Sequence, residues 1–208
     1  GCGTHTNPFF EPTASPTFFD GCSSVPNCQS CSGGHCTYRV HYAEGSSISG
    51  YLALDQIGMI EAGAASGASE LTALSTFGCQ AAESGLFRSQ LADGIMGLGY
   101  GRYNNVADEY VAQHSLRDTV TFCVSRTGGT LSFGADPPLD HDGYFSTPLI
   151  DHSRYLVQIR AISLGSTPLG LTSAQLNSGH GVIFDSGTSV NYWPRAVFAQ
   201  LTSAFTTE

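Results

Sequence analysis

One aspartate lies where a short apolar run meets a turn of small and hydroxylated residues. Asp185 follows three apolar residues, 182–184, and precedes Ser-Gly-Thr-Ser at 186–189. We expect the apolar run to place Asp185 in a largely apolar environment, where hydrogen bonds must compensate an ionised carboxylate. The Gly187 amide and the Thr188 hydroxyl are placed to donate them. Such a carboxylate could act as a general base, although an aspartate that only caps its own tight turn would fit the same pattern.

Other kinds of catalytic site lack their characteristic residues. The sequence contains neither the Gly-x-Ser-x-Gly motif of many serine hydrolases nor the His-Glu-x-x-His motif of zinc peptidases. The seven histidines lie in polar contexts typical of loops. We therefore expect no catalytic metal and no cofactor.

Composition and charge exclude several classes of partner. With 41% hydrophobic and 12% charged residues, the chain is typical of a globular protein. The formal net charge is −9, and all 8 basic residues are arginines that form no patch, which argues against nucleic acid. No apolar run is long enough for a membrane segment, and the opening residues lack the order of a signal peptide. We expect any targeting segment to lie outside this chain.

The cysteines indicate an oxidising compartment. Their number is odd, 7, and four of them crowd between Cys22 and Cys36, which predicts disulfides in a secreted or endomembrane protein. A zinc site with four thiolates is an alternative, because Cys28 and Cys31 form one Cys-x-x-Cys pair. A second such pair is missing. A thioredoxin-type redox pair is less favoured still, because no βαβ pattern follows.

The hydrophobic pattern predicts a mainly β fold with short surface helices. Over 37–59, β-branched and aromatic residues alternate around Glu44-Gly45-Ser46, which is typical of a β-hairpin. Further strand-like runs lie at 70–79, 119–125, 129–134, 155–165 and 181–185. Two amphipathic helices are predicted, one from Asn104 with an asparagine cap and one from Pro194.

Two further stretches mark the organisation of the chain. Residues 1–36 are rich in Gly, Pro, Ser and Cys without a sustained period, which predicts a loop held by cross-links. Residues 125–129 interrupt two strand-like runs. We place a domain boundary there, which gives residues 1–126 and 127–208.

Several motifs, taken together, resemble pepsin-like aspartic peptidases. Phe-Asp-Ser-Gly-Thr-Ser at 184–189 is similar to the second active-site motif of that family. The hairpin from His41 resembles its flap, and Ala-Asp-Gly-Ile-Met-Gly-Leu-Gly from Ala92 resembles the glycine element of its first lobe. The cysteine-rich loop and Phe-Gly-Cys at 77–79 are most similar to nepenthesin-type plant enzymes, and the Tyr-Ala-Glu-Gly-Ser of the flap is similar to plasmepsin V of apicomplexan parasites. The resemblance implies an incomplete bilobal fold, with a partial N-terminal lobe over 1–126 and a partial C-terminal lobe over 127–208.

The resemblance also implies roles for individual residues. Asp185 would be a catalytic aspartate, Gly187 and Thr188 would bind its carboxylate, and Ser186 would lie where the two lobes interlock through hydroxyls. In the flap, Tyr42 and the tip formed by Glu44, Gly45 and Ser46 would close over an extended peptide substrate. Two alternatives stay open: Tyr42 as an ordinary cross-strand aromatic, and Ser186 as a turn residue.

A disulfide pairing follows from the family pattern. It implies a bond between Cys2 and Cys79 and two nested bonds, Cys22 with Cys36 and Cys28 with Cys31. Cys123 would then be unpaired within these residues, with a partner beyond Glu208.

The resemblance leaves Asp185 without its partner. Pepsin-like enzymes use two aspartates, one from each lobe, and the first lobe's Asp-Thr/Ser-Gly motif should precede the flap, yet none does here. A retropepsin-like dimer is excluded by motif order, because the flap and the glycine element both precede Asp185. We therefore expect a chain truncated at both ends, inactive alone, whose partners are the remaining parts of the same peptidase and a peptide substrate.

A non-catalytic relative is the main alternative. A pepsin-like fold can serve as a binding protein, for example as a carbohydrase inhibitor, and then need not contain a first aspartate. The unaltered Asp-Ser-Gly-Thr-Ser at 185–189 favours the peptidase, because a binding protein has no use for it.

Overall fold

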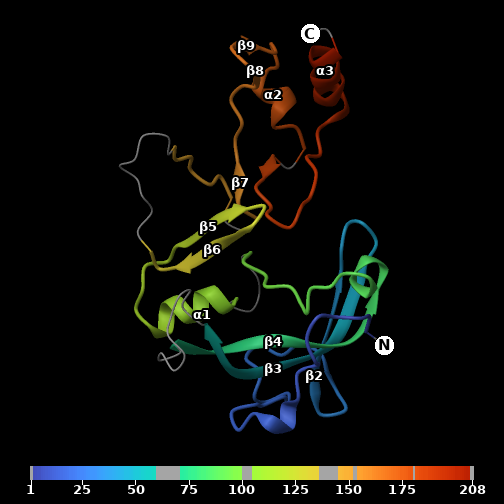
Figure 1. Cartoon of the computed structure of the whole chain (residues 1–208), viewed down its shortest axis with the longest axis vertical. Coiled ribbons are helices and arrows are strands. Elements are labelled where there is room, and N and C mark those ends of the chain that lie inside the picture. The colour runs from blue at the N-terminus through green and yellow to red at the C-terminus, as the bar shows by residue number, and fades with distance from the viewer. Residues whose placement is uncertain are drawn as a thin grey trace. The chain divides into compact units, whose positions relative to one another are not determined.

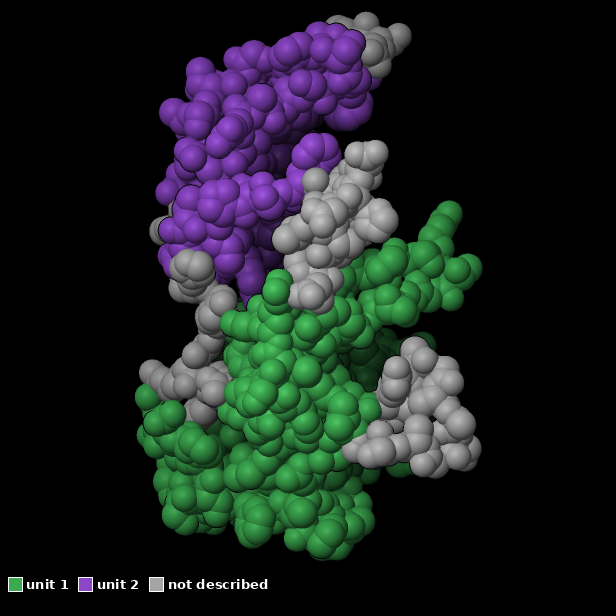
Figure 2. Space-filling model, turned by 90° about the vertical axis from the view of Figure 1, so that its left-hand side faces the viewer, with its two compact units in different colours: residues 1–138 green, residues 139–208 purple. Residues whose placement is uncertain are grey.

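The computed structural model describes residues 2–59, 71–99, 105–135, 145–151, 154–179 and 181–206. The chain divides into two compact units, Gly1–Pro138 and Leu139–Glu208. Figure 1 labels the helices and strands, and Figure 2 distinguishes the two units by colour.

Unit 1 is built on an antiparallel sheet with strand order β1-β2-β3-β4. Its strands are β1 (Cys31–Ser32), β2 (His35–His41), β3 (Ser47–Met59) and β4 (Leu71–Ser84). The other elements of this unit are the hairpin of β5 (Val120–Ser125) and β6 (Gly128–Phe133), the 3-10 helices η1 (Pro12–Ala14) and η2 (Gly85–Arg88), and helix α1 (Val106–Gln113). The hairpin predicted over 37–59 is therefore present as β2 and β3.

Helix α1 is held at its start by an asparagine cap and at its end by β4. The Asn105 side chain accepts hydrogen bonds from the amides of Ala107 and Asp108, at 2.9 and 3.0 Å. The Asp108 carboxylate in turn accepts from the Asn105 amide, which completes a capping box. At the other end, the Gln113 side chain donates to and accepts from the backbone of Leu74, both at 2.9 Å. The predicted asparagine cap is confirmed at Asn105.

Unit 2 contains short strands and two helices around a small apolar core. Its elements are β7 (Leu156–Val157), β8 (Ser163–Leu164), β9 (Thr167–Pro168), α2 (Ser173–Leu176), β10 (Val182–Ile183) and α3 (Arg195–Thr206). The buried residues of this core are Leu171, Leu176 and Val197. Phe198 and Phe205 of α3 are 59% and 66% exposed, so the apolar face predicted for this helix is only partly covered. In the described part of the chain, no helix is long and apolar enough to cross a membrane.

The predicted mainly β fold with few short helices is confirmed. The strand-like runs at 155–165 and 181–185 form shorter strands than their patterns predict. The cause is pairing: among the described residues, the β7–β10 and β8–β9 ladders are each two residues long, and β7 adds a single isolated bridge between Leu156 and Asp151. The boundary predicted between 126 and 127 lies in the turn of the β5–β6 hairpin, where Ser125 pairs with Gly128. The division into two lobes stays a prediction.

Two disulfides close the cysteine-rich loop, but their pairing is interleaved. Cys22 is bonded to Cys31 and Cys28 to Cys36, each with a Cα–Cα distance of 5.8 Å. The predicted nested pairing is therefore wrong. The reason is the β1–β2 ladder, in which Cys31 lies directly opposite Cys36. Each of these two cysteines is bonded to a cysteine of the loop that precedes the ladder. Because all four sulfurs are in disulfides, the alternative of a zinc site with four thiolates is excluded.

The predicted bond between Cys2 and Cys79 is not formed. Both cysteines are free. Cys2 Sγ donates instead to the carbonyl of Gln80 at 3.5 Å. Burial raises the pKa of the Cys79 thiol, which keeps it protonated. Cys123 is free and exposed, and its pairing beyond Glu208 stays a prediction.

A buried carboxylate joins the loop near η1 to the main sheet. Asp55 on β3 is 4% exposed. Its Oδ1 accepts hydrogen bonds from the hydroxyls of Ser15 and Thr17 and from the Gln56 amide. Burial alone would raise the pKa of the Asp55 carboxyl, but the three hydrogen bonds outweigh it, so this pKa lies below its usual 3.8.

Replacing Asp55 with alanine is expected to lower the free energy of unfolding by about 2 kcal/mol, because three donors lose a charged acceptor. Since the folded-state pKa is lower than the unfolded-state pKa, this contribution is complete above about pH 5 and is lost as pH falls below about 4. Urea unfolding of both proteins between pH 3 and 6 measures the difference. A difference that stayed constant over this range would contradict the assignment.

Candidate active site

The strand β10 delivers Asp185 into a turn that binds its carboxylate. Val182 and Ile183 pair with β7, and the Phe184 amide donates to the carbonyl of Tyr155 at 3.2 Å. This pairing ends one residue before the aspartate. The chain then turns, and the Thr188 amide donates to the Asp185 carbonyl at 3.3 Å.

Both oxygens of the Asp185 carboxylate accept a hydrogen bond from this turn. The Gly187 amide donates to Oδ1 at 2.8 Å, and the Thr188 hydroxyl donates to Oδ2 at 2.6 Å. A Cβ at position 187 would lie 3.2 Å from Oδ1, so a residue other than glycine would displace the carboxylate by a few tenths of an ångström. The two hydrogen bonds expected from the sequence are confirmed, and they fix the orientation of the carboxylate.

The environment of Asp185 differs from the one expected. Asp185 and Ser186 are exposed, as are Ile183 (47%) and Phe184 (74%), so the apolar run that precedes the carboxylate does not bury it. The physical reason is that, in the described part of the chain, β10 pairs with one strand, β7, and its other edge has no strand beside it. An exposed carboxylate is accessible to water, which a general base must contact.

Asp185 lies at the wall of a groove of about 550 Å³ within unit 2. Much of its lining is apolar or aromatic, and the residues include Ile159, Leu176, Val182, Phe184, Thr188, Val190, Tyr192 and Trp193. Among the described residues that line it, Asp185 is the only carboxylate. Sequence reasoning assigned nothing to Tyr192 and Trp193, although an aromatic pair directly before Pro194 could have drawn attention to them.

In unit 1, the turn between β2 and β3 forms the predicted hairpin tip. The Tyr42 amide donates to the Ser46 carbonyl at 2.9 Å, and the Gly45 amide donates to the Tyr42 carbonyl at 3.0 Å. Gly45 has a φ of +98°, which side chains with a Cβ rarely adopt. A hydrogen bond from the Ser46 side chain lowers the pKa of the Glu44 carboxyl.

This tip packs against η2. Ser46 is 2% exposed, and its hydroxyl accepts a hydrogen bond from the Leu86 amide at 3.0 Å. The ring of Tyr42 lies 4.9 Å from that of Phe87, between centroids. Burial, and then the Glu44 charge, raise the pKa of the Tyr42 hydroxyl. Tyr42 is therefore a neutral phenol in contact with an aromatic neighbour.

The segment from Ala92 to Gly99 is irregular and mostly exposed, including Ile95 and Met96. Its beginning is bound by the N-terminal residues: His5 Nδ1 lies 2.8 Å from the Ala92 carbonyl, and the Asn7 amide donates to Asp93 at 2.9 Å. No group of three or more His, Cys, Asp or Glu side chains in the described ranges is placed to hold a metal ion.

Comparison with known proteins shows the family of the chain. Residues 2–135 match the model described as Xylanase inhibitor N-terminal. Aspartyl protease AED1 of Arabidopsis thaliana is 28% identical over 98% of this chain and 43% of its own length. Aspartic proteinase nepenthesin-2 of Nepenthes gracilis is 27% identical over 99% of this chain and 47% of its own length, and nepenthesin-1 is 26% identical over 98% and 47%.

The chain thus spans less than half the length of these curated relatives. The mainly β fold agrees with a part of a pepsin-like fold. By the match over residues 2–135, the chain belongs to the pepsin-like aspartic proteases, in the branch that carries the Xylanase inhibitor N-terminal region.

Proposed function

We propose that this chain is a portion of an aspartic endopeptidase and that Asp185 is one of its two catalytic aspartates. The observation that carries the proposal is the carboxylate of Asp185, whose two oxygens each accept one hydrogen bond, from Gly187 and Thr188. The relatives named aspartic proteases, of which the chain spans less than half, support a second aspartate in the longer protein.

Two carboxylates that lie close together share a proton, because they cannot both ionise readily. The protonated one polarises the carbonyl of the peptide bond, and the ionised one takes a proton from the attacking water. In this scheme Gly187 and Thr188 position Asp185 toward that water. Ser186 is exposed next to it, and we assign it to the contact between the two lobes, residues 1–126 and 127–208.

The hairpin tip is proposed to cover an extended peptide substrate. Its backbone can donate and accept hydrogen bonds, and the neutral Tyr42 hydroxyl can donate one. Closing such a tip over the site would exclude water from the reaction. The contact of Tyr42 with Phe87 and of Ser46 with Leu86 keeps the tip ordered before substrate binds.

The two disulfides indicate an oxidising compartment of the secretory pathway. We propose that the longer protein works in the endoplasmic reticulum, in a vacuole or outside the cell.

A binding protein without catalysis is the second candidate, because the matching family model is described as that of a xylanase inhibitor. The bound carboxylate of Asp185 favours the enzyme, since an inhibitory surface does not require both of its oxygens to be held.

Peptide cleavage by the 208-residue chain tests the requirement for a second aspartate. We expect the chain to leave a fluorogenic peptide uncleaved between pH 3 and 7, because one carboxylate cannot be both acid and base. The assay compares the chain with its Asp185→Asn variant. Turnover by the chain that disappears in the variant would contradict the two-aspartate mechanism.

A further inference from the structure

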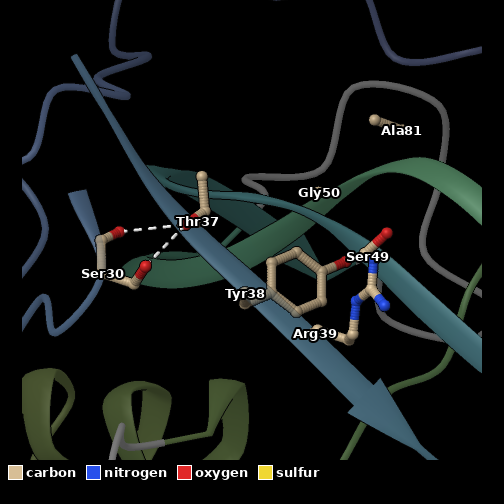
Figure 3. Close-up of a pocket in the computed structure, with 7 residues that line it drawn as sticks. All are labelled: Ser30, Thr37, Tyr38, Arg39, Ser49, Gly50 and Ala81. Atoms are coloured by element: carbon tan, nitrogen blue, oxygen red, sulfur yellow. Dashed lines mark hydrogen bonds between the residues drawn. The ribbon is translucent and has the colours of Figure 1, made fainter. Parts of the chain in front are cut away.

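A hollow of about 440 Å³ lies on the main sheet of unit 1. Its lining residues, drawn in Figure 3, are Ser30, Thr37, Tyr38, Arg39, Ser49, Gly50 and Ala81. They come from β2, β3, β4 and the loop before β1.

A β-bulge produces this hollow. Ser49 pairs with Ala82 and Gly50 with Gln80, so Ala81 is an extra residue in β4 with no partner in the ladder. The backbones lie so close that a Cβ at Gly50 would be 1.9 Å from the Cys79 carbonyl. Only glycine fits at position 50, and the local geometry of the hollow is therefore fixed by the backbone.

Two polar side chains in the hollow, Arg39 and Ser49, have no hydrogen-bond partner among the residues that the structure describes. Arg39 on β2 lies directly opposite Ser49 on β3, and Figure 3 shows the guanidinium beside the serine. In the described part of the chain, no residue accepts a hydrogen bond from the Arg39 guanidinium or from the Ser49 hydroxyl. The Thr37 hydroxyl, in contrast, is bound to Ser30 Oγ at 3.0 Å.

The charge of the hollow is positive. Among the described residues that line it, Arg39 is the only ionic one, although the net charge of the chain is −9. Burial raises the pKa of the Tyr38 hydroxyl, so this neighbour stays a neutral phenol and adds no negative charge. A single positive charge and a neutral hydroxyl match a ligand with one negative charge.

We infer that this hollow binds a carboxylate group, with Arg39 as its bidentate donor and Ser49 as an additional donor. The planar guanidinium presents parallel N–H groups that fit the two oxygens of a carboxylate. The carboxylate comes either from an acidic side chain of a bound peptide or from a small free acid. No residue of the hollow belongs to the Asp185 turn or to the hairpin tip at 42–46, so this inference does not rest on the proposed peptidase activity.

Binding of defined probes to the 208-residue chain tests the inference. The probes are acetyl-Ala-Asp-Ala-amide, its neutral counterpart acetyl-Ala-Asn-Ala-amide, sodium acetate and sodium sulfate, each at pH 6.5. NMR titration follows the Arg39 Nε–Hε signal and gives the dissociation constants. We expect the aspartyl peptide or acetate to shift this signal, and the asparaginyl peptide to leave it unchanged.

Variants locate the site. Arg39→Gln is expected to weaken binding by about tenfold or more and Ser49→Ala by a smaller factor, because the charged hydrogen bonds are the stronger ones. Since Arg39→Gln removes the observed signal, its affinity is followed on the backbone amides of β2 and β3. Arg126→Gln, in the exposed turn between β5 and β6, is the matched control and should bind as the unaltered chain does. Thermal unfolding verifies that each variant is folded.

Tighter binding of the aspartyl peptide than of acetate assigns the carboxylate to a peptide, and equal binding assigns it to a small acid. Three results would overturn the inference: equal binding of the asparaginyl peptide, sulfate binding without carboxylate binding, or no response of Arg39 to any probe. Unchanged affinity in Arg39→Gln would overturn it as well.

Discussion

Asp185→Asn is expected to lower kcat for peptide cleavage by about 10²- to 10⁴-fold in a longer protein that contains both aspartates. Asparagine has nearly the same size and can still accept a hydrogen bond from the Gly187 amide, but it cannot take a proton from water. Because the loss affects the transition state, KM should change little. The measurement is kcat and KM with a fluorogenic peptide between pH 3 and 7.

Asp118→Asn provides the matched control. Asp118 is an exposed aspartate of unit 1, outside the Asp185 groove, and its neutral variant should keep the activity of the parent protein. If Asp185→Asn lowered kcat no more than Asp118→Asn does, Asp185 would not be a catalytic residue.

Replacing Cys28 and Cys36 together with serine is expected to lower the free energy of unfolding by about 2–3 kcal/mol. The bond closes a short loop, with a sequence separation of 8, and removing it increases the entropy of the unfolded chain. Cys36 is also fully buried against Val25 and Leu52, so a serine hydroxyl there would be surrounded by apolar side chains, which cannot form hydrogen bonds with it. Urea unfolding with and without a reductant measures the loss.

A single substitution tests the pairing itself. In Cys22→Ser, the interleaved arrangement leaves Cys31 as the new free thiol, whereas the nested arrangement would leave Cys36. Alkylation without reduction, followed by tandem mass spectrometry, identifies which of the two reacts. Alkylation of Cys36 would show that the nested pairing is the correct one.

For the double variant of Cys28 and Cys36, a loss in the free energy of unfolding below about 1 kcal/mol would contradict the expected contribution of that bond.

Features determined by neighbouring residues could be predicted from the sequence. The hydrogen bonds to Asp185 come from residues two and three positions away, and the hairpin tip depends on Gly45 at a positive φ. The cap of α1 likewise needs only Asn105 and its next three residues. In each case the residue types within one turn decide the geometry.

Features determined by distant residues could not be predicted. The pairing of the four crowded cysteines depends on the register of β1 with β2, which the spacing of cysteines does not reveal. The exposure of Asp185 depends on how many strands flank β10, and the apolar residues at 182–184 do not reveal how many strands lie beside them. The hollow around Arg39 required a bulge opposite Gly50, which only the register of β3 with β4 shows.

The sequence of the full-length transcript tests most directly whether Asp185 works as one of two aspartates. We expect an Asp-Thr/Ser-Gly motif after an apolar strand upstream of Gly1, together with a second glycine element and a cysteine downstream of Glu208. A complete transcript that encodes no upstream aspartate of this kind would leave Asp185 without a partner. That result would contradict the peptidase mechanism and favour a binding protein.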